Sequence, residues 1–199
     1  MKLNWAEMLV VNNPSRVVQQ RFELSWMKSR MPLAPGGAIL EIGCGRGAGA
    51  SIIRKEFLPR LMCAMDLDFF MIRKSFGYLE PEERRNISFF AADALRLPHG
   101  DGVFDAVFGF GVLHHVPDWQ SALQEIARVL KPGGVYFLEE LYPSLYQNFI
   151  TRHILLHPDE NRFRSNDLKK ALTDNGFSLQ STFELKLLGI LAVLRKNTN

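Results

Sequence analysis

The stretch Ile39-Leu40-Glu41-Ile42-Gly43-Cys44-Gly45-Arg46-Gly47 decides the fold of this chain. It starts as an apolar run and ends in three glycines at alternate positions, directly before a segment of helical periodicity, Gly47–Phe57. Glycine lets a backbone turn tightly and approach a ligand without interference from a Cβ atom. The amides at the start of a helix attract anionic or acceptor-rich groups. The stretch therefore predicts a strand, a ligand-binding turn and a helix in succession.

Short apolar runs and longer helical patterns alternate around this turn. The expected strands are Ala38–Ile42, Leu61–Met65, Ile87–Ala91, Phe104–Phe110 and Val135–Glu139. The expected further helices are Asp68–Leu79, with Asp68 as the N-cap, Asp118–Leu130, which Lys131-Pro132-Gly133-Gly134 stops, and Ser165–Asn175, which Gly176 ends. A final hairpin pairs Leu179–Leu185 with Ile190–Leu194 around Gly189.

Nearly continuous apolar strands between amphipathic helices are typical of a parallel sheet that is covered on both faces. The pattern predicts an α/β fold with a doubly wound, Rossmann-like sheet and helices on both faces. The sheet is expected to be mostly parallel, and the closing hairpin predicts an antiparallel final edge strand.

Composition and cysteine usage exclude several classes of protein. The 24 basic and 21 acidic residues leave a net charge of +3, weaker than the excess of a dedicated nucleic-acid binder. The two cysteines, Cys44 and Cys63, form neither a disulfide framework nor a metal-ligand cluster, so we expect no metal site and a cytoplasmic location. No signal peptide is recognisable, and no run approaches the roughly 20 apolar residues that span a bilayer.

The glycine turn and one acidic residue point to an adenosine cofactor. Asp66 follows Gly47 by nineteen residues and ends the second expected strand, where a carboxylate accepts hydrogen bonds from ribose hydroxyls. Gly43, Gly45 and Ala48 also satisfy GxGxxA, the dinucleotide fingerprint. These residues alone leave NAD and other adenosine cofactors open.

Six short motifs in a fixed order distinguish these possibilities. They are Glu41-x-Gly43-x-Gly45-x-Gly47, Met65-Asp66-Leu67-Asp68, Ala92-Asp93-Ala94, Phe104-Asp105-Ala106-Val107, Leu113-His114-His115-Val116 and Leu130-Lys131-Pro132-Gly133-Gly134. Together they make the chain resemble the class I S-adenosylmethionine-dependent methyltransferases, particularly the short single-domain enzymes that act on small molecules. The resemblance covers residues 36–140 and implies S-adenosyl-L-methionine as cofactor, with S-adenosyl-L-homocysteine as its product.

The resemblance also implies which residues hold the methionine part of the cofactor. The loop beneath it would consist of Gly43, Cys44, Gly45 and Gly47. Glu41 would help to hold the α-amino group, directly or through water. Phe110 and Gly111, at the end of the fourth strand, would offer backbone groups toward the same amine.

The adenosine part has its own set of implied contacts. Asp66 would bind the ribose hydroxyls, and Leu67 would pack against the adenine. Asp93 would accept a hydrogen bond from the adenine amino group, while the amide of Ala94 faces the ring. His115 would lie near the rim of the cofactor site.

The resemblance divides residues 1–199, a single methyltransferase domain, into four parts. Residues 36–140 would form the cofactor-binding core and residues 164–199 the terminal helix and hairpin. Residues 1–35 would be a helical extension or lid, and residues 141–163 an insertion near the acceptor site. The aromatic and histidine residues of the last two parts either enclose the acceptor or pack the added helices onto the sheet; they are Trp5, Trp26, Tyr142, Tyr146, Phe149, His153 and His157.

No catalytic motif is expected, because methyl transfer from a sulfonium is an in-line displacement that needs mainly positioning and exclusion of water. A general base is needed only when the acceptor arrives protonated. His114 and His115 are either an acid–base pair or residues that shape the pocket. The sequence therefore names no catalytic residue, and it leaves the acceptor atom and the oligomeric state open.

Three other functions are alternatives to methyl transfer to a small molecule. An NAD(P)-dependent oxidoreductase would need a nicotinamide-side group such as Tyr-x-x-x-Lys, which the chain lacks. An RNA methyltransferase would need a more basic surface or an added domain, so a nucleic-acid partner is disfavoured. A non-catalytic module would keep Glu41, Asp66 and Asp93 but lose the acceptor pocket. The Asn/Asp-Pro-Pro-Tyr arrangement of amino-group methylases is absent after Gly109-Phe110.

Overall fold

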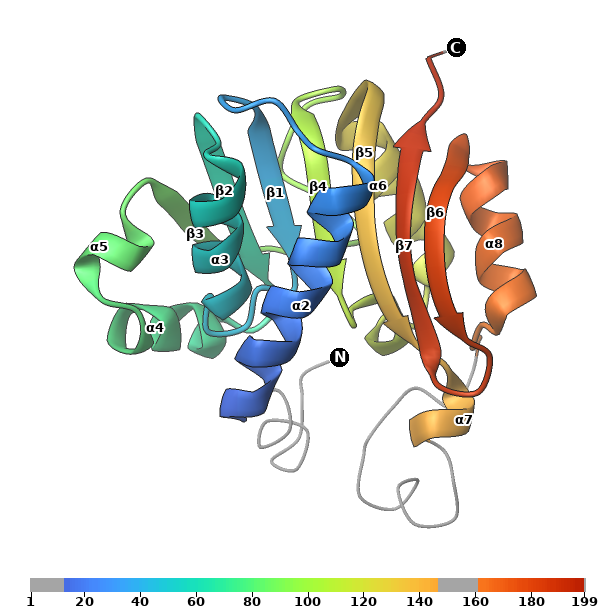
Figure 1. The fold of residues 1–199 in the computed structure, drawn as a ribbon, viewed down its shortest axis with the longest axis horizontal. Helices are drawn as coiled ribbons and strands as arrows, with labels where there is room; N and C mark the ends of the chain where they lie inside the picture. Colours follow the sequence, from blue (N-terminus) through green and yellow to red (C-terminus); the bar gives the residue numbers. More distant parts are fainter. Residues whose placement is uncertain (1–12, 147–160, 199) are drawn as a thin grey trace.

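A seven-stranded sheet forms the centre of the computed structural model, which describes residues 13–146 and 161–198 (Figure 1). Across the sheet the order is β3 (Ile87–Ala91), β2 (Leu61–Asp66), β1 (Ala38–Ile42), β4 (Phe104–Phe110), β5 (Leu130–Leu141), β7 (Gly189–Lys196) and β6 (Phe177–Leu185). The first five strands in this order are parallel to one another, whereas β7 is antiparallel to both β5 and β6. The strand order reverses between β1 and β4, and ligands of open α/β sheets bind at such a point.

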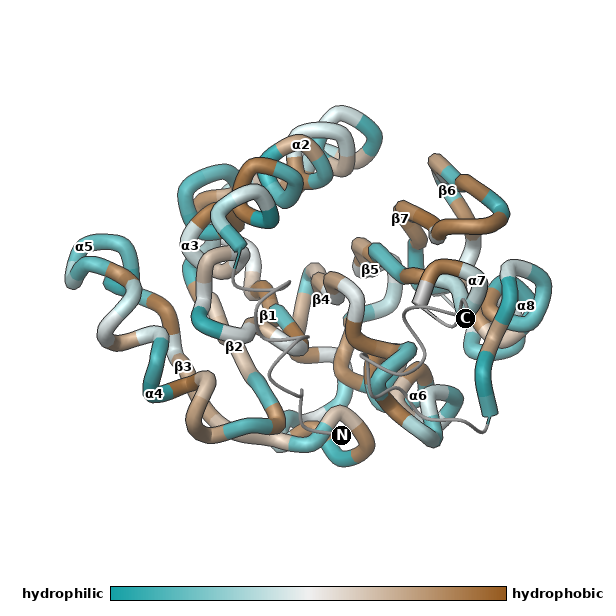
Figure 2. The backbone as a smooth tube through the Cα atoms, turned by 90° about the horizontal axis from the view of Figure 1, so that it is seen from below, coloured by the Kyte–Doolittle hydropathy of each residue, from teal (hydrophilic) through white to brown (hydrophobic). Residues whose placement is uncertain are grey.

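Helices cover both faces of this sheet (Figures 1 and 2). The helical elements are α2 (Pro14–Arg30), α3 (Ala48–Phe57), α4 (Phe69–Tyr78), α5 (Pro81–Arg84), the 3₁₀ turn η1 (Leu113–His115), α6 (Trp119–Val129), α7 (Pro143–Tyr146) and α8 (Ser165–Asp174). Apolar residues of α2 and α3 pack on one face of the sheet, and those of α6 and α8 pack on the other. In the described part of the chain, no helix is long and apolar enough to cross a membrane.

The apolar side chains of the strands contribute to two hydrophobic cores, one on each face of the sheet, because successive side chains of a strand point to opposite faces. In β4, Val107 belongs to the core beneath α6, and Phe108 belongs to the core beneath α2 and α3. The Phe108 ring lies 4.5 Å from the Phe137 ring and 5.3 Å from the Phe57 ring, measured between centroids. This aromatic cluster joins α3 to the centre of the sheet and so holds the turn that precedes α3.

The predicted elements are confirmed with small differences in their bounds. Three strands, β1, β3 and β4, begin and end where the sequence predicts. Asp68 caps α4 by accepting a hydrogen bond from the amide of Phe70, and Asp118 caps α6 through the amide of Ser121. The doubly wound, mostly parallel sheet is confirmed as well.

Two features of the sheet differ from the expectation in detail. Strand β5 begins at Leu130, because Leu130 pairs with Phe104 before Lys131-Pro132-Gly133-Gly134 loops out as an irregularity and pairing resumes at Val135. The final strand, β7, lies between β5 and β6, so that β6 forms the edge. The reason is burial: β7 supplies both cores, whereas most of β6 is exposed.

Candidate functional site

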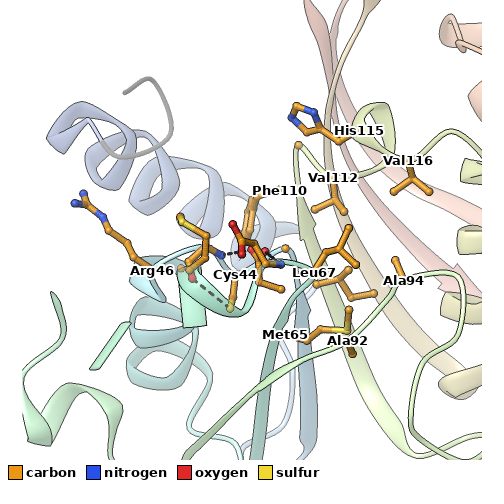
Figure 3. Close-up of a pocket in the computed structure, with 18 of the residues that line it drawn as sticks. Cys44, Arg46, Met65, Leu67, Ala92, Ala94, Phe110, Val112, His115 and Val116 are labelled. Atoms are coloured by element: carbon orange, nitrogen blue, oxygen red, sulfur yellow. Dashed lines mark hydrogen bonds between the residues drawn. The ribbon is translucent and has the colours of Figure 1, made fainter. Parts of the chain in front are cut away.

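A cavity of about 310 Å³ opens at the carboxyl ends of β1, β2 and β4 (Figure 3). Its walls come from α2, the β1–α3 turn with the start of α3, the segment from the end of β2 into α4, the connection after β3, and the segment from β4 through η1. The cavity lies where the strand order reverses, and its volume is at the lower end of the range for small-molecule sites, about 300–1,000 Å³. It is the natural candidate for a ligand site.

The glycines of the β1–α3 turn serve two different purposes. Gly43 has a φ of +71°, and a Cβ atom there would lie 2.5 Å from a methyl group of Val112, so only glycine fits. Gly47 has a φ of +86° but does not line the cavity; its missing side chain makes room for the ring of Phe89 and for Leu79. Thus Gly43 shapes the cavity wall, and Gly47 allows the turn to pack against α4 and β3.

Asp66 ends β2 and faces the cavity. Its two carboxylate oxygens accept hydrogen bonds from the amides of Gly45 and Asp68, each at 2.9 Å. Burial raises the pKa of Asp66, and these two hydrogen bonds oppose the shift. Each carboxylate oxygen has a second lone pair, so the side chain can still accept hydrogen bonds from two hydroxyl groups of a ligand.

Glu41 lies behind the turn and is almost completely buried. It is absent from the cavity wall, and the start of α3 packs so closely on it that a Cβ atom on Gly49 would overlap its Oε1. Its Oε2 is buried and has no hydrogen-bond partner among the described residues. Burial, followed by the negative charge of Asp66, raises the pKa of Glu41 to about 8. This oxygen can therefore accept a further hydrogen bond, although the charge of Arg16 and the amide of Ala50 already oppose part of the pKa shift.

A second buried carboxylate, Glu140, holds the segment after β4 in place. Its Oε1 accepts hydrogen bonds from the amides of Val112 at 2.9 Å and Leu113 at 2.7 Å, and its Oε2 lies 2.7 Å from His114 Nδ1. The two adjacent histidines consequently differ: His114 is buried against Glu140, whereas His115 lines the cavity. Glu140 thus positions the backbone that brings His115 to the cavity.

Arg16, in α2, is a cavity residue that the sequence motifs do not identify. Its guanidinium donates hydrogen bonds to both carboxylate oxygens of Glu23 at 3.0 Å and to Glu139 Oε2 at 2.9 Å. Burial raises the pKa of Glu139 to about 7, although Arg16 opposes that shift. Arg16 lies outside every sequence motif, so no local pattern identifies it. The sequence predicts only that its segment, residues 1–35, is a helical extension or lid.

Most of the residues that the sequence selects line this cavity. They are Gly43, Cys44, Gly45, Asp66, Leu67, Asp93, Ala94, Phe110, Gly111 and His115. The thiol of Cys44 is buried, and burial raises its pKa, which argues against a nucleophilic role. The guanidinium of Arg46 points away from the other labelled residues in Figure 3 and lies 3.8 Å from the centroid of the Tyr78 ring.

The aromatic and histidine residues of the two added segments are only partly described. Trp5, Phe149, His153 and His157 lie outside the described residues, as does the side chain of Tyr146. Tyr142 is buried and donates a hydrogen bond to Glu184 at 2.8 Å, which is a packing role. Trp26 lines a separate groove beside α2.

The family model and the curated proteins that this chain matches are methyltransferases. Residues 40–138 match the family model described as a methyltransferase domain. The fatty-acid O-methyltransferase of Mycolicibacterium smegmatis is 37% identical over 111 residues, which cover 54% of this chain and 38% of that protein. The demethylmenaquinone methyltransferase of Lactococcus lactis is 35% identical over 119 residues, which cover 58% of this chain and 47% of that protein.

Solved structures show the same fold at lower sequence identity. A putative sarcosine dimethylglycine methyltransferase from Galdieria sulphuraria superposes with a TM-score of 0.78 at 17% identity, covering 92% of this chain and 86% of that one. A methyltransferase from Aquifex aeolicus gives a TM-score of 0.74 at 16% identity, covering 98% of this chain and 99% of that one. The chain spans between a third and just over half of the length of the curated relatives that it matches.

Proposed function

We propose that the cavity binds S-adenosylmethionine and that the protein methylates a small-molecule acceptor, because this chain belongs to the class I S-adenosylmethionine-dependent methyltransferases. One observation carries the proposal. A single cavity at the reversal of strand order gathers the turn at Gly43 and Gly45, the carboxylate of Asp66 and the side chain of Asp93. These are the groups that an adenosine carrying a charged tail requires.

The residues present fit the cofactor. The two remaining acceptor positions of Asp66 suit the ribose hydroxyls, and Asp93 with Leu67 and Ala94 suits the adenine. The unpartnered oxygen of Glu41, directly behind the turn, suits the α-ammonium group, reached directly or through water. When bound, S-adenosylmethionine supplies a methyl group that its sulfonium already activates.

The chain's own contribution to the reaction is positioning and exclusion of water. Val112, His115 and Val116 lie along the wall formed after β4, where Glu140 accepts hydrogen bonds from the amides of Val112 and Leu113. Of the two adjacent histidines, His115 is the one that faces the cavity, so we assign to it any proton transfer from a protonated acceptor.

The relatives suggest the nature of the acceptor. Their names place fatty acids, sterols and demethylmenaquinone among the molecules that they methylate, and all three are largely apolar. We propose an apolar small molecule for this chain as well, rather than a nucleic acid, since the net charge of +3 is low. Two free, buried cysteines suit a reducing compartment such as the cytoplasm.

Calorimetric titration with S-adenosylmethionine, S-adenosylhomocysteine and NAD tests the cofactor. We expect micromolar binding of the first two and none of NAD. Asp66→Asn should weaken binding roughly tenfold or more, because the amide removes the charge and replaces one acceptor by a donor. Asp118→Asn is the matched control, since asparagine also caps helices and Asp118 lies outside the cavity.

Other outcomes would contradict the proposal. Binding of NAD alone by the folded protein would favour an oxidoreductase, and binding of none of the three ligands would exclude this cofactor site. Methyl transfer itself is tested by following a labelled methyl group from S-adenosylmethionine into a panel of apolar acceptors.

A further inference from the structure

A groove of about 370 Å³ lies between α2 and the β6–β7 hairpin, apart from the cofactor cavity. Phe22 and Trp26 of α2 form one wall, and Phe183, Leu185 and Leu191 of the hairpin contribute to the other. Its surface is almost wholly apolar. Figure 2 shows α2 and the strongly hydrophobic hairpin facing each other across this opening.

The groove is open because no helix among the described residues covers that side of the hairpin. Helix α8 packs against the opposite side, where Lys169 pairs with Glu184 of β6, and α2 contacts β7. As a result, 74% of Phe22 and 58% of Phe183 are exposed. Large exposed apolar side chains that gather around a groove are typical of a binding surface.

One end of the groove meets the cofactor cavity at a small polar cluster. Glu23 and Glu139 line the groove, while Arg16, which pairs with both, lines the cavity. The two hollows therefore share a wall made of two ion pairs. A molecule lying in the groove would have a long apolar surface along its length and a guanidinium with two carboxylates at its inner end.

This shape selects one kind of occupant. We propose that the groove binds the hydrocarbon portion of a long-chain, amphipathic methyl acceptor whose polar end lies at Arg16, beside the cofactor cavity. The inference rests on the proposed function and adds a binding subsite to it. The volume falls within the range of small-molecule sites, and the ion pairs of Arg16 place the groove beside the cavity, as an acceptor site requires.

Two leucines of β6 provide a matched pair of variants. Leu185 lines the groove and is 49% exposed, whereas Leu179 is 47% exposed and lies outside it. Leu185→Asp and Leu179→Asp thus place the same charge on the same strand at equal exposure. Phe22→Ser, on the opposite wall, provides an independent variant should Leu185→Asp fail to fold.

Dodecanoic acid is the probe, titrated by calorimetry into protein saturated with S-adenosylhomocysteine. The wild type and Leu179→Asp should bind it equally, and Leu185→Asp and Phe22→Ser should each bind at least about tenfold more weakly. Shorter acids should lose about fourfold in affinity for each methylene removed, as expected for burial of a hydrocarbon chain. All four proteins should bind S-adenosylhomocysteine with the same affinity.

The controls separate this inference from the proposed function. Failure of the wild type to bind S-adenosylhomocysteine contradicts the proposed function. Normal binding of that ligand, with no binding of dodecanoic acid or with equal loss in both leucine variants, overturns the groove as an acceptor subsite. A dimer that Leu185→Asp dissociates, with dodecanoic acid binding unchanged, would assign the groove to a second copy of the chain instead.

Discussion

At the scale of single residues, the burial of Glu41 is the most consequential feature. The carboxyl group lies under the start of α3, with one oxygen unpartnered and Asp66 nearby, so its charged form is disfavoured. A buried polar atom that lacks a partner costs stability, and proteins keep such atoms mainly where a ligand satisfies them. In the proposed function, this oxygen of Glu41 is the acceptor for the cationic group of the cofactor.

The stability of the free protein should fall as the pH rises from about 4.5 to about 8. The pKa of Glu41 is about 8 in the folded chain, against an ordinary value of 4.5, so between these values the folded state binds more protons than the unfolded state. The free energy of unfolding then decreases with pH. Glu41→Gln, which carries no titrating group, should melt several degrees higher than wild type near pH 9, corresponding to about 2–5 kcal/mol.

Thermal melting of both proteins from about pH 5 to pH 9 measures this effect. The difference in melting temperature should be small at the acidic end and grow toward the alkaline end. The difference cancels the contributions of other titrating groups, including Glu139. A difference that stays constant with pH would show that Glu41 is ionised throughout.

At the scale of elements, the contact of α3 with β1 depends on Gly49. A Cβ atom there would overlap Glu41 Oε1 and lie 3.2 Å from Gln20 Nε2, so the helix can approach the strand only without a side chain. Gly49→Ala should displace the Glu41 carboxyl group, lower the stability and weaken S-adenosylhomocysteine binding by about tenfold.

Gly77 provides the matched control for this substitution. It also lies within a helix, α4, but a Cβ atom there would meet nothing within 4 Å. Gly77→Ala should leave binding unchanged and raise the stability by about 0.5 kcal/mol through helix propensity. Urea unfolding and calorimetry measure both effects, and equal behaviour of the two variants would mean that α3 packs loosely on β1.

The elements themselves were largely predictable, because their signals are local. The caps at Asp68 and Asp118 and the apolar run of β4 each depend on residues within a few positions of one another. For the loop inside β5, the sequence predicts only a helix stop. Pairing of Leu130 with Phe104 is a contact between distant segments, which periodicity does not reveal.

At the scale of the whole molecule, α2 is tied to the sheet by Arg16. The guanidinium joins Glu23 of the same helix to Glu139 of β5, and all three side chains are largely buried. Arg16→Met should leave the two carboxylates without their cation and cost up to about 3–5 kcal/mol. We expect faster amide hydrogen exchange in α2, while the parallel strands exchange at their original rates.

Lys28→Met is the control on the same helix. Lys28 pairs with Glu56, but both side chains are almost half exposed, so removal of the pair should cost at most about 1 kcal/mol. Hydrogen exchange followed by mass spectrometry distinguishes the two variants. Equal protection of α2 in both would show that apolar packing of Leu24 and Met27, and not Arg16, holds the helix.

By itself the sequence determined the strand–turn–helix unit around Gly43, the doubly wound sheet and ten of the residues that line the cavity. These follow from periodicity and from backbone requirements that act over a few residues. Only the tertiary structure decided that Glu41 lies behind the turn, that Gly47 serves packing, that Arg16 joins the site and that a groove opens beside α2. Each of these depends on which distant surfaces meet and exclude water, because burial and ion pairing are properties of the assembled molecule.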